Sequence, residues 1–163
     1  MALPAHDHLD ALGIAYEARS FPVETEKGAA NVARALGFRE DQMVKTLIFQ
    51  TGDGERALVM VPANKSAVSG LLKRALGSRN IRLAAPEAVQ QTTGYEIGSV
   101  PPFHWQPQGF TSLVDASLMR EESLGVGAGV WGQEIILTPE ALVRASEARV
   151  VNLTERSSPP SVP

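Results

Sequence analysis

Lys45 is the residue of this chain whose type and position most clearly suggest chemistry. It interrupts an apolar run rich in branched and aromatic residues, Met43-Val44-Lys45-Thr46-Leu47-Ile48-Phe49, which favours a β-strand. Burying an unpaired ammonium group is costly or removes its proton, so the side chain must reach a sheet end, a counter-charge or a polar cleft. A lysine that projects from a strand into a cleft is suited to a phosphate or a carbonyl oxygen. A gatekeeper charge at a strand end is the structural alternative.

A second candidate is the stretch from Thr93 to Pro102, with the sequence Thr-Gly-Tyr-Glu-Ile-Gly-Ser-Val-Pro-Pro. Its two glycines and two prolines surround few freely rotating residues and predict a stiff loop. The backbone amides of such a loop can point into a cleft, where they stabilise a carbonyl oxygen that becomes negative during acyl transfer. A surface turn between a helix and a strand is the alternative.

The glycines of Gly127-Ala128-Gly129-Val130-Trp131-Gly132 have the spacing of a dinucleotide-binding fingerprint. That fingerprint must follow a strand and open a helix, whereas the residues after Gly132 are typical of a strand. The glycines therefore indicate a tight turn and a close approach of backbone to a ligand. A nucleotide-binding protein that uses this turn is the weakest of the hypotheses that the sequence allows.

Other kinds of site find little support. The chain has no cysteine, which excludes disulfides, thiolate metal sites and cysteine nucleophiles. Of its three histidines, His6 and His8 lie near the N-terminus and His104 stands alone. The sequence has neither a Walker phosphate loop nor a nucleophile elbow. We therefore expect no metal and no cofactor, and any hydrolysis should proceed without a covalent side-chain nucleophile.

Length and charge narrow the class of protein. The 163 residues suit one domain, and the formal net charge of −3 argues against a general nucleic-acid coat protein. No apolar stretch reaches the roughly 20 residues that span a bilayer, and the N-terminus does not resemble a signal peptide, so a cytoplasmic protein is expected. The segment 56–86 nevertheless contains six basic residues and no acidic one, which suits either a short piece of phosphate backbone or a solvated helix face: Arg56, Lys65, Lys73, Arg74, Arg79 and Arg82.

Helices and strands are predicted to mix without strict alternation, which favours a single α+β domain around a mixed, curved β-sheet with surrounding helices. We expect this domain over residues 1–156 and a disordered serine- and proline-rich tail over 157–163. The expected helices are 8–13, 26–36, 64–77, 86–92 and one that opens at Pro139. The expected strands are 15–21, 43–49, 56–62, 81–84, 111–115, 123–128, 133–137 and 149–153.

Taken in chain order, these segments resemble the YbaK family, the editing domains associated with prolyl-tRNA synthetase. The resemblance covers roughly residues 24–153. Its matching elements are the strand with Val44-Lys45-Thr46-Leu47, the strand Leu58 to Pro62, the helix end Arg74-Ala75-Leu76-Gly77, Thr93-Gly94-Tyr95, the Gly-x-x-x-Pro loop Gly98 to Pro102, Val114-Asp115, and the turn with Gly127, Gly129 and Gly132.

The resemblance implies a free-standing, trans-acting deacylase that hydrolyses the ester of mischarged tRNA, most typically tRNA(Pro) carrying the smaller non-cognate cysteine or alanine. A synthetase pocket shaped for proline rejects small apolar competitors by only about 1–3 kcal/mol, so a second site restores fidelity. The implied partners are the acceptor end of aminoacyl-tRNA and, as a candidate, prolyl-tRNA synthetase, with no membrane. A non-catalytic module of the same fold that binds aminoacyl-tRNA or a synthetase is the alternative.

The resemblance also implies the site. Lys45 would hold the terminal adenosine phosphate or the aminoacyl end, and the loop backbone would cradle the aminoacyl group and exclude proline. Catalysis would rest on a positioned water and the ribose hydroxyl of the substrate. The expected catalytic residues are Lys45, Gly98, Ser99 and Val100. The expected substrate-binding residues are Thr46, Tyr95, Pro101, Pro102, Asp115, Gly127 and Gly129.

Three of these assignments have structural alternatives. Thr46 is also an ordinary β-branched strand residue, Asp115 also suits a structural turn, and Tyr95 either stacks on adenine or packs. The sequence Gly129-Val130-Trp131 departs from family members that have a histidine near this turn.

Overall fold

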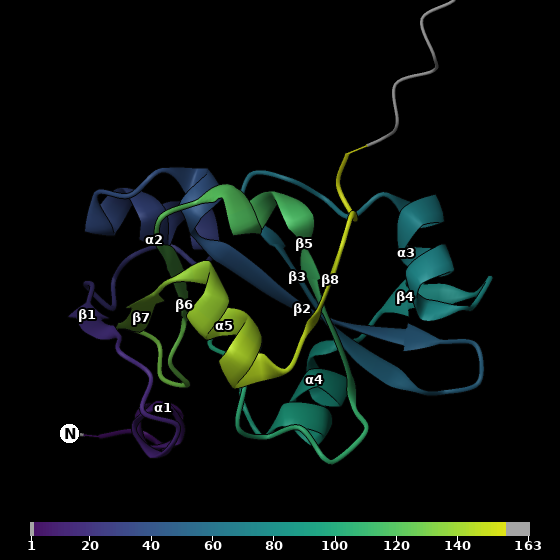
Figure 1. Ribbon diagram of the computed structural model, residues 1–163, viewed down its shortest axis with the longest axis horizontal. Helices are drawn as coiled ribbons and strands as arrows, with labels where there is room; N and C mark the ends of the chain where they lie inside the picture. Colours follow the sequence, from purple (N-terminus) through teal and green to yellow (C-terminus); the bar gives the residue numbers. More distant parts are fainter. Residues whose placement is uncertain (1, 156–163) are drawn as a thin grey trace, which may run out of the picture.

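The computed structural model describes residues 2–155, which form two β-sheets flanked by helices (Figure 1). The α-helices are α1 (Pro4–Ala11), α2 (Ala29–Leu36), α3 (Ser69–Leu76), α4 (Pro86–Thr93) and α5 (Pro139–Ser146). Two short 3₁₀ helices are η1 (Glu40–Gln42) and η2 (Ala116–Arg120). The strands are β1 (Glu17–Ser20), β2 (Val44–Thr51), β3 (Arg56–Pro62), β4 (Ile81–Leu83), β5 (Thr111–Asp115), β6 (Leu124–Gly127), β7 (Gln133–Leu137) and β8 (Arg149–Val151).

The larger sheet has five strands in the order β4-β2-β3-β5-β8. The β2–β3 pair is an antiparallel hairpin, whereas β5 runs parallel to both β3 and β8, so the sheet is mixed. After its first residue β3 is buried throughout. This agrees with its nearly continuous apolar sequence, which is typical of a central strand covered on both faces.

The smaller sheet is antiparallel, with the order β1-β7-β6. A bridge between Met43 and Gly125 joins it to the larger sheet at the beginning of β2. On the edge away from β3, strand β2 pairs with β4 only over residues 49–51. Between the bridge at Met43 and the pairing with β4, the beginning of β2 therefore has a free edge, and the turn between β6 and β7 comes next to it.

Apolar side chains fill the space between these layers. The largest buried cluster contains Leu9, Leu58, Phe103 and Ile135, and a second one packs α2 against the small sheet through Val32 and Ile136. Figure 1 shows α1, α2 and the small sheet at one end of the molecule, and α3, β4 and the tip of the β2–β3 hairpin at the other. Among residues 2–155, no helix combines the length and hydropathy needed to cross a bilayer.

The predicted α+β class and the mixed sheet are confirmed. The arrangement of the strands in two sheets, joined by a single bridge between Met43 and Gly125, was not predicted, because such a contact links residues that are far apart in the sequence. Three helices start elsewhere than expected: α1 at Pro4 instead of residue 8, α2 at residue 29 instead of 26, and α3 at residue 69 instead of 64. The predicted tail, residues 157–163, lies outside the described part of the chain.

The late start of α2 has a local cause. Gly28 has φ +124°, a conformation that no helical residue adopts, so the helix begins only after it. The late start of α3 has a tertiary cause, since the amide of Val68 donates to the carbonyl oxygen of Leu153 at 2.7 Å. That hydrogen bond keeps the chain before Ser69 extended beside the C-terminal segment.

Candidate functional site

A cavity of about 190 Å³ lies at the free edge of β2. Its walls come from four parts of the fold: the beginning of β2, the N-terminal end of α2, the loop between α4 and β5, and the β6–β7 hairpin. The lining residues are Gly28, Ala29, Val32, Val44, Lys45, Thr46, Leu47, Ile97, Gly98, Val100, Gly127, Trp131 and Glu134. The structure thus brings five of the predicted site residues together: Lys45, Thr46, Gly98, Val100 and Gly127.

Lys45 supplies the cation of this pocket. It is half-buried, and it takes part in none of the ion pairs found among residues 2–155. Burial lowers its pKa, because the surroundings solvate the ammonium less well than water does. The N-terminal end of α2 lies beside it, with no acidic residue in its first turn. Helix dipole and ammonium together make this side of the pocket attractive to an anion or a polarised carbonyl oxygen.

Two further polar side chains in the pocket have no internal partner. The hydroxyl oxygen of Thr46 is buried and forms no hydrogen bond within the described chain. Glu134 is only 6% exposed, and none of the ion pairs or side-chain hydrogen bonds found in residues 2–155 involves it. Burial raises the pKa of its carboxyl group to about 8, so that the group is largely protonated at neutral pH.

Glu134 was missed at the sequence level although its signal resembles that of Lys45. It is a charged residue within the apolar strand Gln133-Glu134-Ile135-Ile136-Leu137. Its side chain lies on the face of β7 that turns towards α2, together with that of Ile136, and this places it in the pocket. A protonated carboxyl group in this position can donate a hydrogen bond as well as accept one.

The Gly98–Pro102 loop closes over the β6–β7 hairpin at very short range. A side-chain carbon placed on Gly127 would lie 3.0 Å from the carbonyl oxygen of Val100 and 3.2 Å from that of Ser99. Position 127 therefore has to be glycine for the backbones to approach this closely. The predicted close approach of these glycines to a ligand stays a prediction, and the close approach seen at Gly127 is to the loop backbone.

The amides of this loop divide into two kinds. The amide of Ser99 donates to the carbonyl oxygen of Glu96 at 3.1 Å, and its side chain is buried, so Ser99 does not line the pocket. Gly98 and Val100 do line it, and neither of their amides donates a hydrogen bond to the part of the chain that the structure describes. These two amides are the ones available to a bound ligand.

Pro101 and Pro102 support the loop from behind rather than line the pocket. Both residues are buried. Their carbonyl oxygens accept hydrogen bonds from the indole of Trp105 at 2.6 Å and the amide group of Gln106 at 2.8 Å. These contacts fix the direction of the backbone just after Val100.

Tyr95 and Gly129 pack against each other outside the cavity lining. Gly129 has φ +104°, and a side-chain carbon there would come within 2.7 Å of the Tyr95 ring. The hydroxyl group of Tyr95 is hydrogen-bonded to Nε2 of His104 at 2.5 Å, and His104 itself has φ +78°. This group joins the start and the end of the loop, which favours the packing role left open for Tyr95.

Trp131 forms one wall of the pocket and is held from several sides. Its indole N–H donates to the carbonyl oxygen of Val23 at 3.0 Å, and Phe21 meets the ring edge-on at a centroid distance of 4.8 Å. The ammonium group of Lys27 lies 3.9 Å from the ring centroid. Such a cation–π contact, together with the hydrogen bond, limits rotation of the indole ring.

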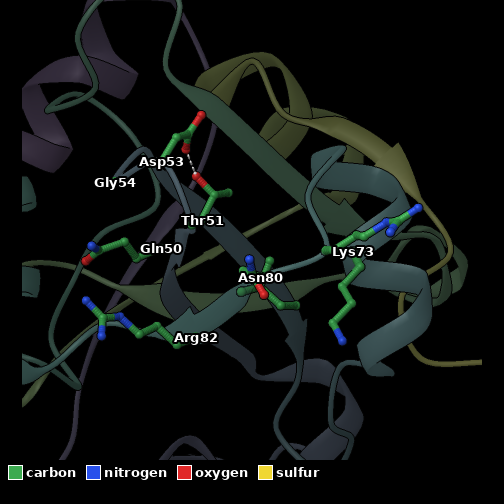
Figure 2. Close-up of a pocket in the computed structure, with 10 residues that line it drawn as sticks. Gln50, Thr51, Asp53, Gly54, Lys73, Asn80 and Arg82 are labelled. Atoms are coloured by element: carbon green, nitrogen blue, oxygen red, sulfur yellow. Dashed lines mark hydrogen bonds between the residues drawn. The ribbon is translucent and has the colours of Figure 1, made fainter.

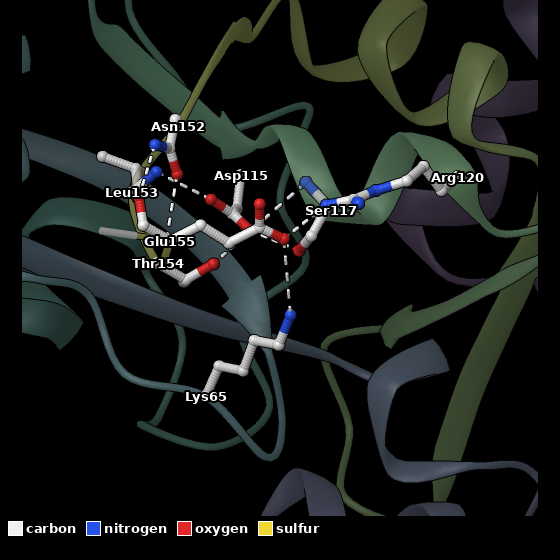
Figure 3. Close-up of polar contacts among 8 residues, drawn as sticks. All are labelled: Lys65, Asp115, Ser117, Arg120, Asn152, Leu153, Thr154 and Glu155. Atoms are coloured by element: carbon white, nitrogen blue, oxygen red, sulfur yellow. Dashed lines mark hydrogen bonds and ion pairs between the residues drawn. The ribbon is translucent and has the colours of Figure 1, made fainter. Parts of the chain in front are cut away.

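Asp115 does not reach the pocket. It is fully buried and accepts hydrogen bonds from the amide of Leu153 at 2.7 Å, the hydroxyl of Thr154 at 2.8 Å, and both the amide and hydroxyl of Ser117 (Figure 3). These partners belong to η2 and to the segment after β8. Its contacts fit the structural role that the sequence had left open.

Metal chemistry has no obvious place in the described chain. Residues 2–155 contain no group of three or more His, Asp or Glu side chains arranged to hold a metal ion.

Comparison with known proteins gives this geometry a family. Residues 23–145 match the aminoacyl-tRNA editing domain family, a stretch that begins before α2 and ends within α5. The chain belongs to this family. Every residue that lines the pocket falls within the matched part of the editing domain.

Several relatives of this editing domain carry informative names. The chain is 26% identical over 155 residues to the multifunctional Ser/Thr-tRNA deacylase ProXp-y of Escherichia coli K12, covering 90% of this chain and 91% of that protein. It is 25% identical over 133 residues to EbsC of Enterococcus faecalis, provisionally named a Cys-tRNA(Pro)/Cys-tRNA(Cys) deacylase, covering 82% and 80%. A solved structure provisionally described as a trans-editing enzyme for prolyl-tRNA synthetase superposes with a TM-score of 0.83 and 26% identity, over 96% and 99% of the two chains.

Proposed function

We propose that this editing domain is an aminoacyl-tRNA deacylase, which hydrolyses the ester between a non-cognate amino acid and the 3′ end of a tRNA. The observation that carries the proposal is the composition of the pocket at the free edge of β2. There a cation, a free hydroxyl, a buried carboxyl group and two loop amides without a partner in the described chain line a space whose other walls are largely apolar. The names of the two deacylase relatives support the same reaction.

The reaction needs few protein groups. A water molecule attacks the ester carbonyl carbon, the carbonyl oxygen becomes negative, the bond to the ribose oxygen breaks, and that oxygen takes up a proton. In our proposal the amides of Gly98 and Val100 stabilise the oxyanion, and Lys45 binds the terminal phosphate or the carbonyl oxygen. Ser99 contributes through the loop conformation, because its amide is already bonded to Glu96. As the family resemblance implies, we assign activation of the water to the substrate's own ribose hydroxyl rather than to a protein group.

The size of the pocket bears on the amino acid removed. A volume of about 190 Å³ is small, and Val32, Val100 and Trp131 bound it with rigid apolar surface. We infer that a small aminoacyl group such as alanyl or cysteinyl is the substrate and that prolyl is excluded by the Gly98–Pro102 loop. Thr46 and protonated Glu134 supply the polar contacts available to its α-amino group or to a small polar side chain.

The test is a panel of tRNA(Pro) charged with alanine, cysteine, serine or proline and incubated with the wild-type chain and a Lys45→Ala variant. We expect release of one small amino acid, and a loss of at least about 100-fold in kcat/KM for Lys45→Ala, the size reported for removing one group that stabilises a transition state. Lys45→Arg is the matched control, because it keeps the charge but changes the geometry at the strand edge. Circular dichroism and thermal unfolding verify that both variants fold.

Two outcomes would redirect the proposal. Near wild-type turnover of Lys45→Ala would remove Lys45 from the chemistry while leaving the reaction in place. Tight binding of charged tRNA without turnover, on tRNA(Pro) and on other tRNAs, would identify the chain as a non-catalytic binding module of the same fold.

A further inference from the structure

A hollow larger than the Lys45 pocket lies elsewhere in the described chain. It has a volume of about 630 Å³ and lies where the tip of the β2–β3 hairpin meets the α3–β4 turn. Its lining is mostly polar and includes the side chains of Lys73, Arg79, Asn80 and Arg82. In Figure 2 Lys73 extends from α3 on one side of Asn80, and Arg82 lies on the other side near Gln50. Nothing in the proposed chemistry uses this hollow, which we call the basic hollow.

The basic side chains of this hollow are not used in ion pairs within the described chain. Lys73, Arg79 and Arg82 are all exposed, and none of the ion pairs found in residues 2–155 includes them. The one carboxylate in the lining, Asp53, is bonded to the hydroxyl of Thr51 and accepts from the amide of Glu55 at 3.3 Å. Asp53 forms an ion pair with none of the three cations, so three positive charges and one negative charge leave the lining with a net charge of +2, on a chain with a net charge of −3.

The position of the basic hollow relative to the pocket is set by one strand. Lys45 and Thr51 lie near opposite ends of β2, six residues apart, which corresponds to about 20 Å at roughly 3.3 Å per residue. Both sites lie on the same edge of β2, because β4 pairs with that edge at residues 49–51 and leaves the beginning of the strand free. A long ligand whose reactive end occupies the pocket can run along this edge.

A nucleic-acid backbone has the matching shape and charge. Along the axis of a duplex, the phosphates of one strand recur about every 3.4 Å, so an axial distance of about 20 Å corresponds to roughly six nucleotides. The hollow that adjoins the Lys45 pocket near α4 has mixed charge, with Glu87 and Glu96 beside Lys27. Of these two hollows, the basic hollow is therefore the better suited to bind phosphates, although it lies farther from Lys45 along β2.

Resting on the proposed function, we propose that Lys73, Arg79 and Arg82 bind the phosphate backbone of the tRNA acceptor arm while its 3′ end occupies the Lys45 pocket. These contacts go to phosphates rather than bases, so they position the substrate without selecting its sequence. This second contact fixes the register of the RNA, so that the ester reaches the Gly98 and Val100 amides.

The experiment measures the binding of fluorescently labelled, uncharged tRNA over a range of salt concentrations. The test variant is Lys73→Gln/Arg79→Gln/Arg82→Gln. The matched control, Arg34→Gln/Arg120→Gln/Arg144→Gln, removes the same charge from exposed positions that line neither the pocket nor the basic hollow. Because each phosphate contact contributes about 0.7 to 0.9 to the slope of log K against log salt, we expect the slope of the test variant to fall by about 2 to 3. Its affinity at low salt should fall at least about tenfold, and the control should stay within about twofold of wild type.

Hydrolysis of two charged substrates provides the second readout. With full-length charged tRNA, the test variant should show a raised KM and an unchanged kcat. With an aminoacylated trinucleotide that corresponds to the 3′ end, it should equal wild type, because this substrate is too short to reach the basic hollow.

Three results would overturn the inference: tRNA binding by the test variant that equals wild type, an equal loss in the control variant, or a loss that appears only when a synthetase is added, which would identify a protein surface instead. Failure of wild type to bind any tRNA would overturn it as well. If wild type binds tRNA through these residues but hydrolyses no charged tRNA, the inference holds and the proposed deacylase activity fails, so the two claims are separable.

Discussion

At the scale of single residues, the pocket is defined by groups that the fold leaves without partners. Within residues 2–155, Lys45 forms no ion pair and the hydroxyl of Thr46 forms no hydrogen bond, and Glu134 keeps its proton because burial makes ionisation costly. Buried polar groups in folded proteins are nearly always satisfied, so the unpaired hydroxyl of Thr46, in a cavity that also contains Lys45 and Glu134, indicates that a ligand completes the set. The sequence revealed Lys45 through a charge within an apolar strand.

The raised pKa of Glu134 makes a prediction about pH. Its folded-state pKa of about 8 lies above the ordinary value of 4.5, which applies in the unfolded chain, so the stability that this difference provides is fully present below about pH 4.5 and is lost as the pH rises through 8. With 1.36 kcal/mol for each unit, wild type should lose on the order of 4 kcal/mol relative to Glu134→Gln between pH 4.5 and 9. Two cations face Glu134. Lys45 lines the same pocket, and Arg19 lies opposite Glu134 in the β1–β7 register.

The measurement is urea unfolding of wild type and Glu134→Gln at intervals from pH 4.5 to pH 9. As the pH rises, wild type should become less stable relative to Glu134→Gln, and the difference between the two unfolding free energies should shrink or change sign. A difference that does not vary with pH would mean that the carboxyl group is already ionised inside the folded pocket.

At the scale of elements, the pocket depends on how closely the Gly98–Pro102 loop approaches the β6–β7 hairpin. We expect Gly127→Ala to push the loop away by a few tenths of an ångström, because the new methyl group would lie 3.0 Å from the carbonyl oxygen of Val100. Since small misplacements of catalytic groups are costly, kcat/KM for deacylation should fall about tenfold or more. Gly70→Ala is the control, as Gly70 lies in α3 with nothing within 4 Å of the added carbon. An active Gly127→Ala variant would show that the loop tolerates displacement.

A substitution at Gly98 tests the same loop through its own backbone conformation. Gly98 has φ +90°, where residues with a side chain are strained although the space beside it is empty. Gly98→Ala should therefore cost about 1 kcal/mol in unfolding free energy and change the backbone conformation of this part of the pocket lining, which lowers kcat. Thermal unfolding and single-turnover hydrolysis separate the two effects. Unchanged turnover in a folded Gly98→Ala variant would make this loop a connector.

Some features of this fold are determined by residues close together in the sequence and others by contacts between distant segments. This difference explains how much of the molecule the sequence could predict. The strand Arg56–Pro62 was predicted with its observed bounds because its apolar run and its turn are local signals. The bridge between Met43 and Gly125, the split into two sheets and the start of α3 depend on contacts between distant segments, which periodicity does not record. Asp115 shows the same limit within the site: its type and family position suggested a ligand contact, and only the fold shows that Leu153, Thr154 and Ser117 already satisfy it.

At the scale of the whole molecule, the parts that hold the fold together are distinct from the parts that form the pocket. Figure 3 shows Asp115 at the centre of contacts that tie the end of β5 and η2 to the segment after β8. The pocket lies on the opposite side of β3 in the strand order, at the free edge of β2. Stability and activity should therefore respond to different substitutions.

Asp115→Ala tests this separation. The substitution leaves the amide of Leu153 buried without an acceptor and removes a charge-assisted group of hydrogen bonds, which costs about 2–4 kcal/mol. In a chain of this length that corresponds to a decrease of roughly 10 °C in Tm. At a temperature well below the new Tm, kcat/KM should stay within about twofold of wild type, whereas Lys45→Ala should show the reverse pattern of intact Tm and lost turnover. A large loss of turnover in folded Asp115→Ala would mean that this carboxylate communicates with the pocket through β5 and β3, and that the division between scaffold and site proposed for this fold is wrong.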